Sequence, residues 1–128
     1  MALDNPDTFY KSPPAGFDGF FDWEFLIPAF APSKITPMDL DGIIERRGKF
    51  IVFETKRGNV PIPLGQQYTL EALANTGLFN VIILRAKTPE EIDSWERWRG
   101  PPITKEVFTG DAAALVEFVG KWYQFANG

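Results

Sequence analysis

Two segments rich in β-branched and aromatic residues, 39–45 and 49–56, lie on either side of the dipeptide Arg47-Gly48. A short turn between two such segments is the strongest local signal for a β-hairpin. A two-residue turn at Arg47-Gly48 sets the register and places Ile43 directly opposite Val52. We therefore expect a hairpin at the centre of the fold, with each residue of one segment paired to a defined residue of the other.

This register brings acidic residues together. It places Asp41 opposite Glu54 and Asp39 opposite Lys56. Because side chains alternate along a strand, one face of the hairpin carries both pairs with Ile43 and Val52. The other face carries apolar residues that would enter the core: Leu40, Ile44, Ile51 and Phe53.

Directly opposed side chains are about 5 Å apart at Cβ, and like charges there are destabilising. A divalent cation between Asp41 and Glu54 would offset the repulsion, and so would a shared proton. The alternative is an ordinary solvated hairpin face, on which an acid and a lysine are surface electrostatics. The spacing alone leaves these interpretations open.

The remaining segments alternate between helical and extended patterns. Before the hairpin we expect an extended arm over residues 1–16 and a short helix near 20–30. After it we expect a helix over 66–77 and a buried strand over 79–85. A short helix from the cap at Thr88 to Trp95 or Trp98, a short strand at 106–109 and a final helix capped by Asp111 would complete the chain. This order predicts one α/β domain over residues 1–128, with a small mixed sheet that contains the hairpin and is flanked by helices.

The composition excludes several kinds of chemistry. The 128 residues include no cysteine and no histidine, so disulfides, histidine triads and ordinary zinc sites are ruled out. Carboxylates are the remaining metal ligands, and their oxygens favour Mg²⁺ or Mn²⁺. The net charge of -4 disfavours a protein that holds duplex DNA by bulk charge.

The sequence also predicts the cellular setting. Residues 1–10 lack the basic and apolar regions of a signal peptide, and no apolar run approaches the ~20 residues that span a bilayer. We expect an intracellular, cytoplasmic protein with no membrane partner.

The hairpin residues resemble a known family. Asp41, a hydrophobic strand, a turn and a second strand that ends in Glu54-Thr55-Lys56 are similar to the motif of the PD-(D/E)XK nuclease superfamily. Gln66, at the start of the next helix and on its sheet-facing side, resembles an element of the RecB-like and small phage-type members. The resemblance covers mainly residues 22–85 and implies a restriction-endonuclease-like core.

The resemblance also implies roles for single residues. Mg²⁺ or Mn²⁺ would bind Asp41, Glu54 and the backbone carbonyl of Thr55, while Lys56 and Gln66 would complete the catalytic set. An acid from the first helix often joins such sites; Glu24 is the candidate, with Asp22 as an alternative. Asp39 is expected to be a partner or outer group rather than the main ligand.

The implied activity is hydrolysis of DNA phosphodiester bonds. The sequence does not decide whether the substrate is DNA or RNA, or whether it is single-stranded, duplex or branched. Assembly into a homodimer or a larger complex is also left open. The competing hypothesis is an inactive binding or assembly module that keeps the nuclease fold. Trp95 and Trp98 could stack on bases, although tryptophans at helical spacing are more often core residues. Several basic residues could contact phosphates, although each is more often an ordinary surface residue: Arg46, Arg47, Lys49, Arg57, Arg85, Lys87, Arg97 and Arg99.

Overall fold

The computed structural model describes residues 22–128, so the expected arm over residues 1–16 lies outside the described part. The chain divides into two compact units, Met1–Asp39 and Leu40–Gly128. In the first unit, the expected short helix is a 3₁₀ helix, η1 (Glu24–Phe30), which contains Pro28 and buries none of its residues. Proline inside a helix removes a backbone donor, which agrees with the short length of η1.

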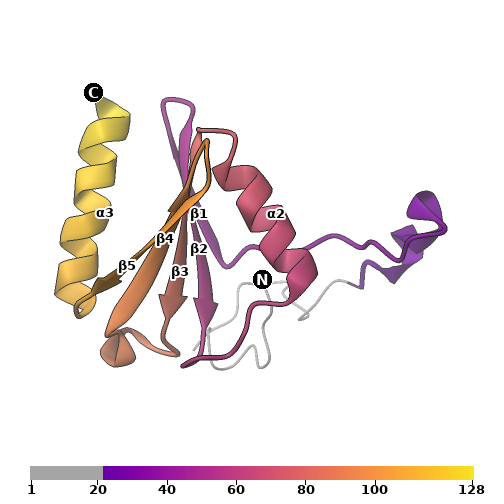
Figure 1. Cartoon of the computed structure of the whole chain (residues 1–128), viewed down its shortest axis with the longest axis horizontal. Coiled ribbons are helices and arrows are strands. Elements are labelled where there is room, and N and C mark those ends of the chain that lie inside the picture. Colours follow the sequence, from indigo (N-terminus) through magenta and orange to yellow (C-terminus); the bar gives the residue numbers. More distant parts are fainter. Residues whose placement is uncertain (1–21) are drawn as a thin grey trace, which may run out of the picture. The chain divides into compact units, whose positions relative to one another are not determined.

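The second unit is a five-stranded mixed sheet with one α-helix on each face (Figure 1). Its strands, in the order β1-β2-β3-β4-β5, are β1 (Gly42–Arg46), β2 (Lys49–Lys56), β3 (Phe79–Arg85), β4 (Ser94–Arg99) and β5 (Thr104–Thr109). Only β2 and β3 run parallel, and the other neighbours are antiparallel. The predicted α/β class with a small mixed sheet is confirmed.

The hairpin of β1 and β2 has the predicted register. Ile43 pairs with Val52, and the ladder runs from Arg46 opposite Lys49 to Gly42 opposite Phe53. Arg47 and Gly48 both have positive φ, 53° and 79°, which is the conformation of a type I′ turn. The twist of this turn matches that of the two strands, so a two-residue loop suffices.

The segment after β3 differs from the prediction. A 3₁₀ turn, η2 (Pro89–Glu91), follows Thr88, but Trp95 and Trp98 lie on strand β4 and not on a helix. Spacing of three places both tryptophans on one helical face, whereas in a strand it places them on opposite faces of the sheet. Both are buried, at 2% and 3% exposed, because both faces of the sheet are covered. The predicted short strand at 106–109 is β5, which begins earlier, at Thr104.

The two α-helices cover different faces of the sheet. Helix α2 (Leu64–Ala74) is the crossover between the parallel strands β2 and β3, and it buries Leu70 and Ala74. Helix α3 (Ala112–Asn127) begins at Asp111, whose carboxylate accepts a hydrogen bond from the N–H of Ala114 at 3.0 Å, as the sequence predicts. The apolar core on the α3 side is formed by Ile51, Ile82, Trp95, Trp122 and Ala126.

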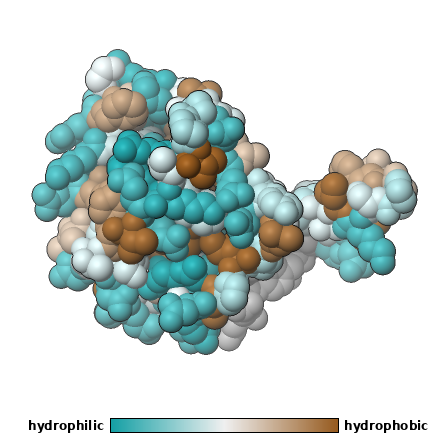
Figure 2. Space-filling model, in the orientation of Figure 1, coloured by the Kyte–Doolittle hydropathy of each residue, from teal (hydrophilic) through white to brown (hydrophobic). Residues whose placement is uncertain are grey.

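Hydrophilic side chains predominate on the face shown in Figure 2, and hydrophobic ones form small separate patches there. Scattered apolar residues of this kind are normal on a protein surface. Within residues 22–128, no helix has the length and apolar character needed to cross a membrane.

Candidate active site

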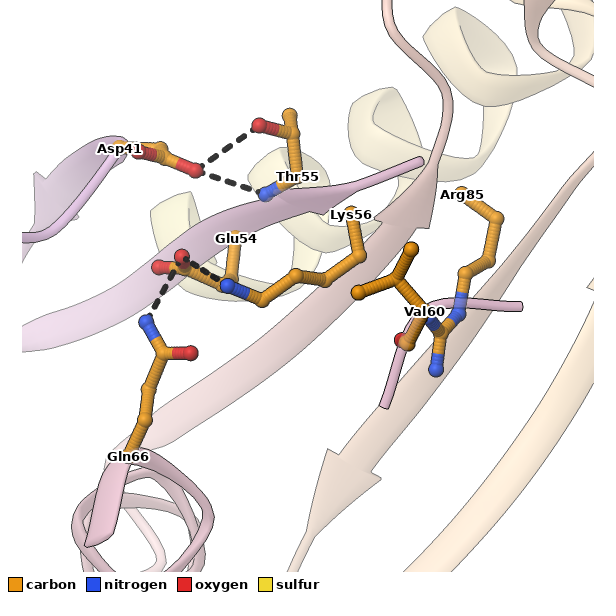
Figure 3. A network of polar contacts seen from close by, with 7 residues as sticks. All are labelled: Asp41, Glu54, Thr55, Lys56, Val60, Gln66 and Arg85. Atoms are coloured by element: carbon orange, nitrogen blue, oxygen red, sulfur yellow. Dashed lines mark hydrogen bonds and ion pairs between the residues drawn. The ribbon is translucent and has the colours of Figure 1, made fainter. Parts of the chain in front are cut away.

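The predicted site residues come from neighbouring elements of the unit 40–128. Asp41 directly precedes β1, Glu54 and Lys56 lie at the end of β2, and Gln66 lies in the first turn of α2. After β2 the chain leaves the sheet and forms α2, which covers the face of the sheet on which the Glu54 side chain lies. This crossover brings Gln66 back to Glu54, as Figure 3 shows.

Glu54 is the centre of the cluster. Its side chain is 1% exposed, and its Oε1 accepts a hydrogen bond from Nε2 of Gln66 at 2.8 Å. Nζ of Lys56 lies 3.5 Å from the same oxygen. Burial, followed by the negative charge of Asp41, raises the pKa of Glu54 above its ordinary value of 4.5, while Lys56 and Gln66 act in the opposite direction.

Asp41 is held by a neighbour that the sequence did not indicate. Its Oδ2 accepts hydrogen bonds from the backbone N–H of Thr55 at 2.8 Å and from the Thr55 hydroxyl at 2.9 Å (Figure 3). These two donors fix a carboxylate beside Glu54, and no cation within residues 22–128 forms an ion pair with it. The only available signal was the Thr between Glu54 and Lys56, a residue type that readily donates to nearby acceptors.

The carbonyl of Thr55 lies on the same edge of β2 as Asp41. The N–H and C=O of one strand residue point to the same neighbour, and the direction alternates along the strand. The N–H of Phe50 donates to Leu78 on the β3 side, and that of Thr55 donates to Asp41 on the β1 side. Since the β1–β2 ladder ends at Gly42 opposite Phe53, this carbonyl lies beyond the paired region.

Two oxygens of the cluster lack hydrogen-bond donors. Oε2 of Glu54 and Oε1 of Gln66 are both buried and have no partner among the described residues. A buried acceptor without a donor is costly, at about 1–3 kcal/mol. Carboxylate, amide and backbone carbonyl oxygens are also the ligands that Mg²⁺ and Mn²⁺ prefer. The cluster therefore contains oxygens of the type that bind these ions, on Asp41, Glu54, the Thr55 carbonyl and Gln66.

The other two predicted metal ligands belong to the unit Met1–Asp39. Glu24 begins η1, and its N–H donates to Asp22 at 2.9 Å. Asp39 closes that unit, and the ladder that would carry its pairing with Lys56 stops at Gly42. Residues 22–128 contain no group of three or more acidic side chains close enough to hold one ion. A role for Glu24 or Asp39 in metal binding stays a prediction.

Some of the basic residues predicted to contact phosphates are already engaged within the protein. Arg85 pairs in register with Lys56 and donates to the carbonyl of Val60, with Glu96 at 3.6 Å (Figure 3). Arg46 donates to Oδ1 of Asn127 at 2.6 Å. The burial of Trp95 and Trp98 confirms that they are core residues and leaves neither ring free to stack on a base.

Comparison with known proteins adds no relative. No protein-family model matches the chain, and neither the curated proteins nor the solved structures contain a match. The resemblance to the PD-(D/E)XK nucleases therefore depends on Asp41, Glu54, Lys56 and Gln66 and on the way the fold brings them together.

Proposed function

We propose that this chain is a metal-dependent nuclease of the PD-(D/E)XK type, with a restriction-endonuclease-like core, that hydrolyses phosphodiester bonds in DNA. The observation that carries the proposal is the buried Glu54: Oε2 has no donor among residues 22–128, Gln66 and Lys56 contact only Oε1, and the negative charge of Asp41 is close enough to raise the pKa. A buried carboxylate is retained at such a cost mainly where charge is used.

Each residue of the cluster has a role in this chemistry. Asp41, Glu54, the Thr55 carbonyl and Oε1 of Gln66 would hold Mg²⁺ or Mn²⁺. A bound ion of this kind supplies an activated water and polarises the phosphate. Nε2 of Gln66 fixes the orientation of Glu54.

Lys56 would act on the substrate. Its side chain is 15% exposed and its Nζ lies 3.5 Å from Glu54, so the ammonium would contact a phosphate oxygen while it stays attracted to the carboxylate. A cation in this position stabilises charge that develops in the transition state. None of these steps needs the histidine or cysteine that the chain lacks.

Cleavage of defined nucleic acids tests the proposal. Single-stranded, duplex and branched DNA, and RNA, are incubated with the protein and Mg²⁺ or Mn²⁺, and products are separated by gel electrophoresis. We expect Glu54→Gln and Lys56→Ala to reduce the rate by about 100-fold or more. Matched controls are Glu117→Gln and Lys34→Ala at exposed positions, which should cleave like the wild type. Wild-type rates in Glu54→Gln and Lys56→Ala would exclude the assignment.

One observation favours a second function, an inactive binding or assembly module. The described residues bring only two carboxylates together, fewer than a complete acidic ligand set. Titration calorimetry with Mg²⁺ and Mn²⁺ separates the two proposals. A nuclease site should bind the ion with a heat that Asp41→Asn abolishes, whereas absence of both binding and cleavage would support the inactive module.

A further inference from the structure

A cavity lies on the opposite face of the sheet from Glu54. It has a volume of about 380 Å³, within the range of small-molecule sites. Ile51, Asn80 and Arg97 line it from the strands, and the second half of α3 closes it. Asn80 lies at the start of β3, whereas Glu54 lies near the end of β2, so this cavity is separate from the candidate active site.

The cavity has a surplus of positive charge. Arg97 and Arg99 share one carboxylate, that of Glu106, at 2.8 Å and 3.5 Å. Lys121 adds a third cation, and its ion pair with Glu117, at 3.9 Å between two side chains about three-quarters exposed, holds it only weakly. Two guanidinium groups against one carboxylate leave capacity for an anion, and guanidinium groups bind phosphate well.

Aromatic rings line the same cavity. Phe125 is 64% exposed, and Nζ of Lys49 lies 5.5 Å from the centre of its ring. The guanidinium of Arg97 lies over the ring of Phe118, 5.4 Å from its centre. The indole of Trp122 is 8% exposed, and its N–H has no partner among residues 22–128. The cavity thus combines aromatic rings with the amide of Asn80, which can both donate and accept.

We propose that this cavity binds a nucleotide, that is, a planar base carrying a phosphate. The base would stack against Phe125, Asn80 would contact its polar edge, and Arg99 and Lys121 would contact the phosphate. A concave site of this size holds one ring and its phosphate rather than a duplex. The source is either a free mononucleotide or one unit of a single strand, and the proposal does not depend on the nuclease assignment.

Titration calorimetry at constant salt and with a metal chelator tests this site. The probes are dAMP, its unphosphorylated nucleoside, inorganic phosphate and a five-nucleotide single strand. We expect dAMP to bind about tenfold or more tightly than either the nucleoside or phosphate, because a charge-assisted contact and a stacking contact are each lost. If the strand binds more tightly than dAMP, the natural ligand is a strand; if not, it is a free nucleotide.

Variants of the lining residues test whether dAMP binds in this cavity. The double variant Arg99→Gln/Lys121→Gln and the single variant Phe125→Ala should each weaken binding of dAMP by about tenfold or more. All three side chains are largely exposed, so the folded state should persist, which thermal unfolding followed by circular dichroism checks. Lys87→Gln removes one exposed charge outside the cavity, and Glu54→Gln alters the candidate active site; both should bind like the wild type.

Three results would overturn the proposal. They are the absence of saturable binding of dAMP, wild-type affinity in the double variant, and an equal loss of affinity in Lys87→Gln. The last would indicate attraction to the general charge of the protein. Cleavage activity does not enter these measurements, so loss of the nuclease assignment would leave this result unchanged.

Discussion

The two faces of the sheet place alternate residues of one strand in opposite settings. On the α3 side, Ile51 and Ile82 lie in an apolar core. On the α2 side, Glu54 is equally buried but carries a carboxyl group, whose Oε1 accepts from Gln66 and whose Oε2 has no donor within residues 22–128. Since both faces are covered by a helix, burial alone does not separate them. The α2 side also buries apolar residues, among them Val52, Ile83 and Leu70, so both faces stabilise the fold. The comparison teaches that the α2 side in addition keeps a buried carboxyl group that costs stability.

The largest expected effect is on the α3 side. Ile82→Ala should lower the free energy of unfolding by about 2–5 kcal/mol, because it leaves a cavity in a close-packed core. Urea unfolding followed by circular dichroism measures the change. A loss below about 1 kcal/mol would show that the α3 face is not the main core and would break the comparison.

Glu54→Gln should change the free energy of unfolding in the opposite direction. The substitution keeps the size of the side chain and removes a charge that burial disfavours, so we expect stability equal to the wild type or higher, by on the order of 1 kcal/mol. The same urea measurement applies. A loss as large as that of Ile82→Ala would mean that Glu54 is a structural residue, and the inferred use of its charge would have to be abandoned.

The pH dependence sharpens the same contrast. Because the pKa of Glu54 is raised in the folded state, the folded protein binds its proton more tightly than the unfolded chain. Ionisation of Glu54 therefore lowers stability as the pH rises from about the unfolded value of 4.5 through the folded pKa, and the cost is absent below 4.5. The stability advantage of Glu54→Gln should grow with pH over that window. A constant difference between the two proteins from acid to neutral pH would contradict it.

The smallest effect concerns the start of α3. Asp111→Ala removes the oxygen that accepts from Ala114 and should cost about 1 kcal/mol. Thermal unfolding measures the change, and Glu117→Ala on the exposed side of the same helix is the control, with no expected loss. Binding of Mg²⁺ should not change, because α3 covers the other face; a change would show that the two faces are coupled.

Most of the fold could be predicted because its signals are local. The turn at Arg47-Gly48 sets the hairpin register, Asp111 begins α3, and Gln66 faces the sheet as its helical position predicts. Strand β4 could not be recognised because its two tryptophans have helical spacing. In the structure they are buried on opposite faces of the sheet, and Arg97 pairs with Glu106 across the β4–β5 hairpin.

The sequence predicted that Asp41, Glu54 and Gln66 would lie close together, but not which hydrogen bonds they would make. The opposition of Asp41 and Glu54 followed from the register, and the charge of Asp41 does raise the pKa of Glu54. The hydrogen bonds from Thr55 to Asp41 could not be foreseen, because they depend on the end of the ladder at Gly42 and on the bend before it. The alternation of side chains along a strand predicts the face of the sheet on which a side chain lies, but not the groups that donate hydrogen bonds to it.

The single parallel junction in the sheet has a consequence for folding kinetics. The pair β1–β2 and the group β3–β4–β5 are antiparallel and joined by short connections, so each can form from local contacts. The β2–β3 pairing requires the whole α2 crossover to close first, and contacts over longer sequence separations form more slowly. The bond from Gln66 to Glu54 depends on that crossover. We therefore expect Gln66→Ala to speed unfolding and leave the refolding rate nearly unchanged in stopped-flow experiments, so that the site is assembled after the rate-limiting step; slower refolding would place it in the nucleus.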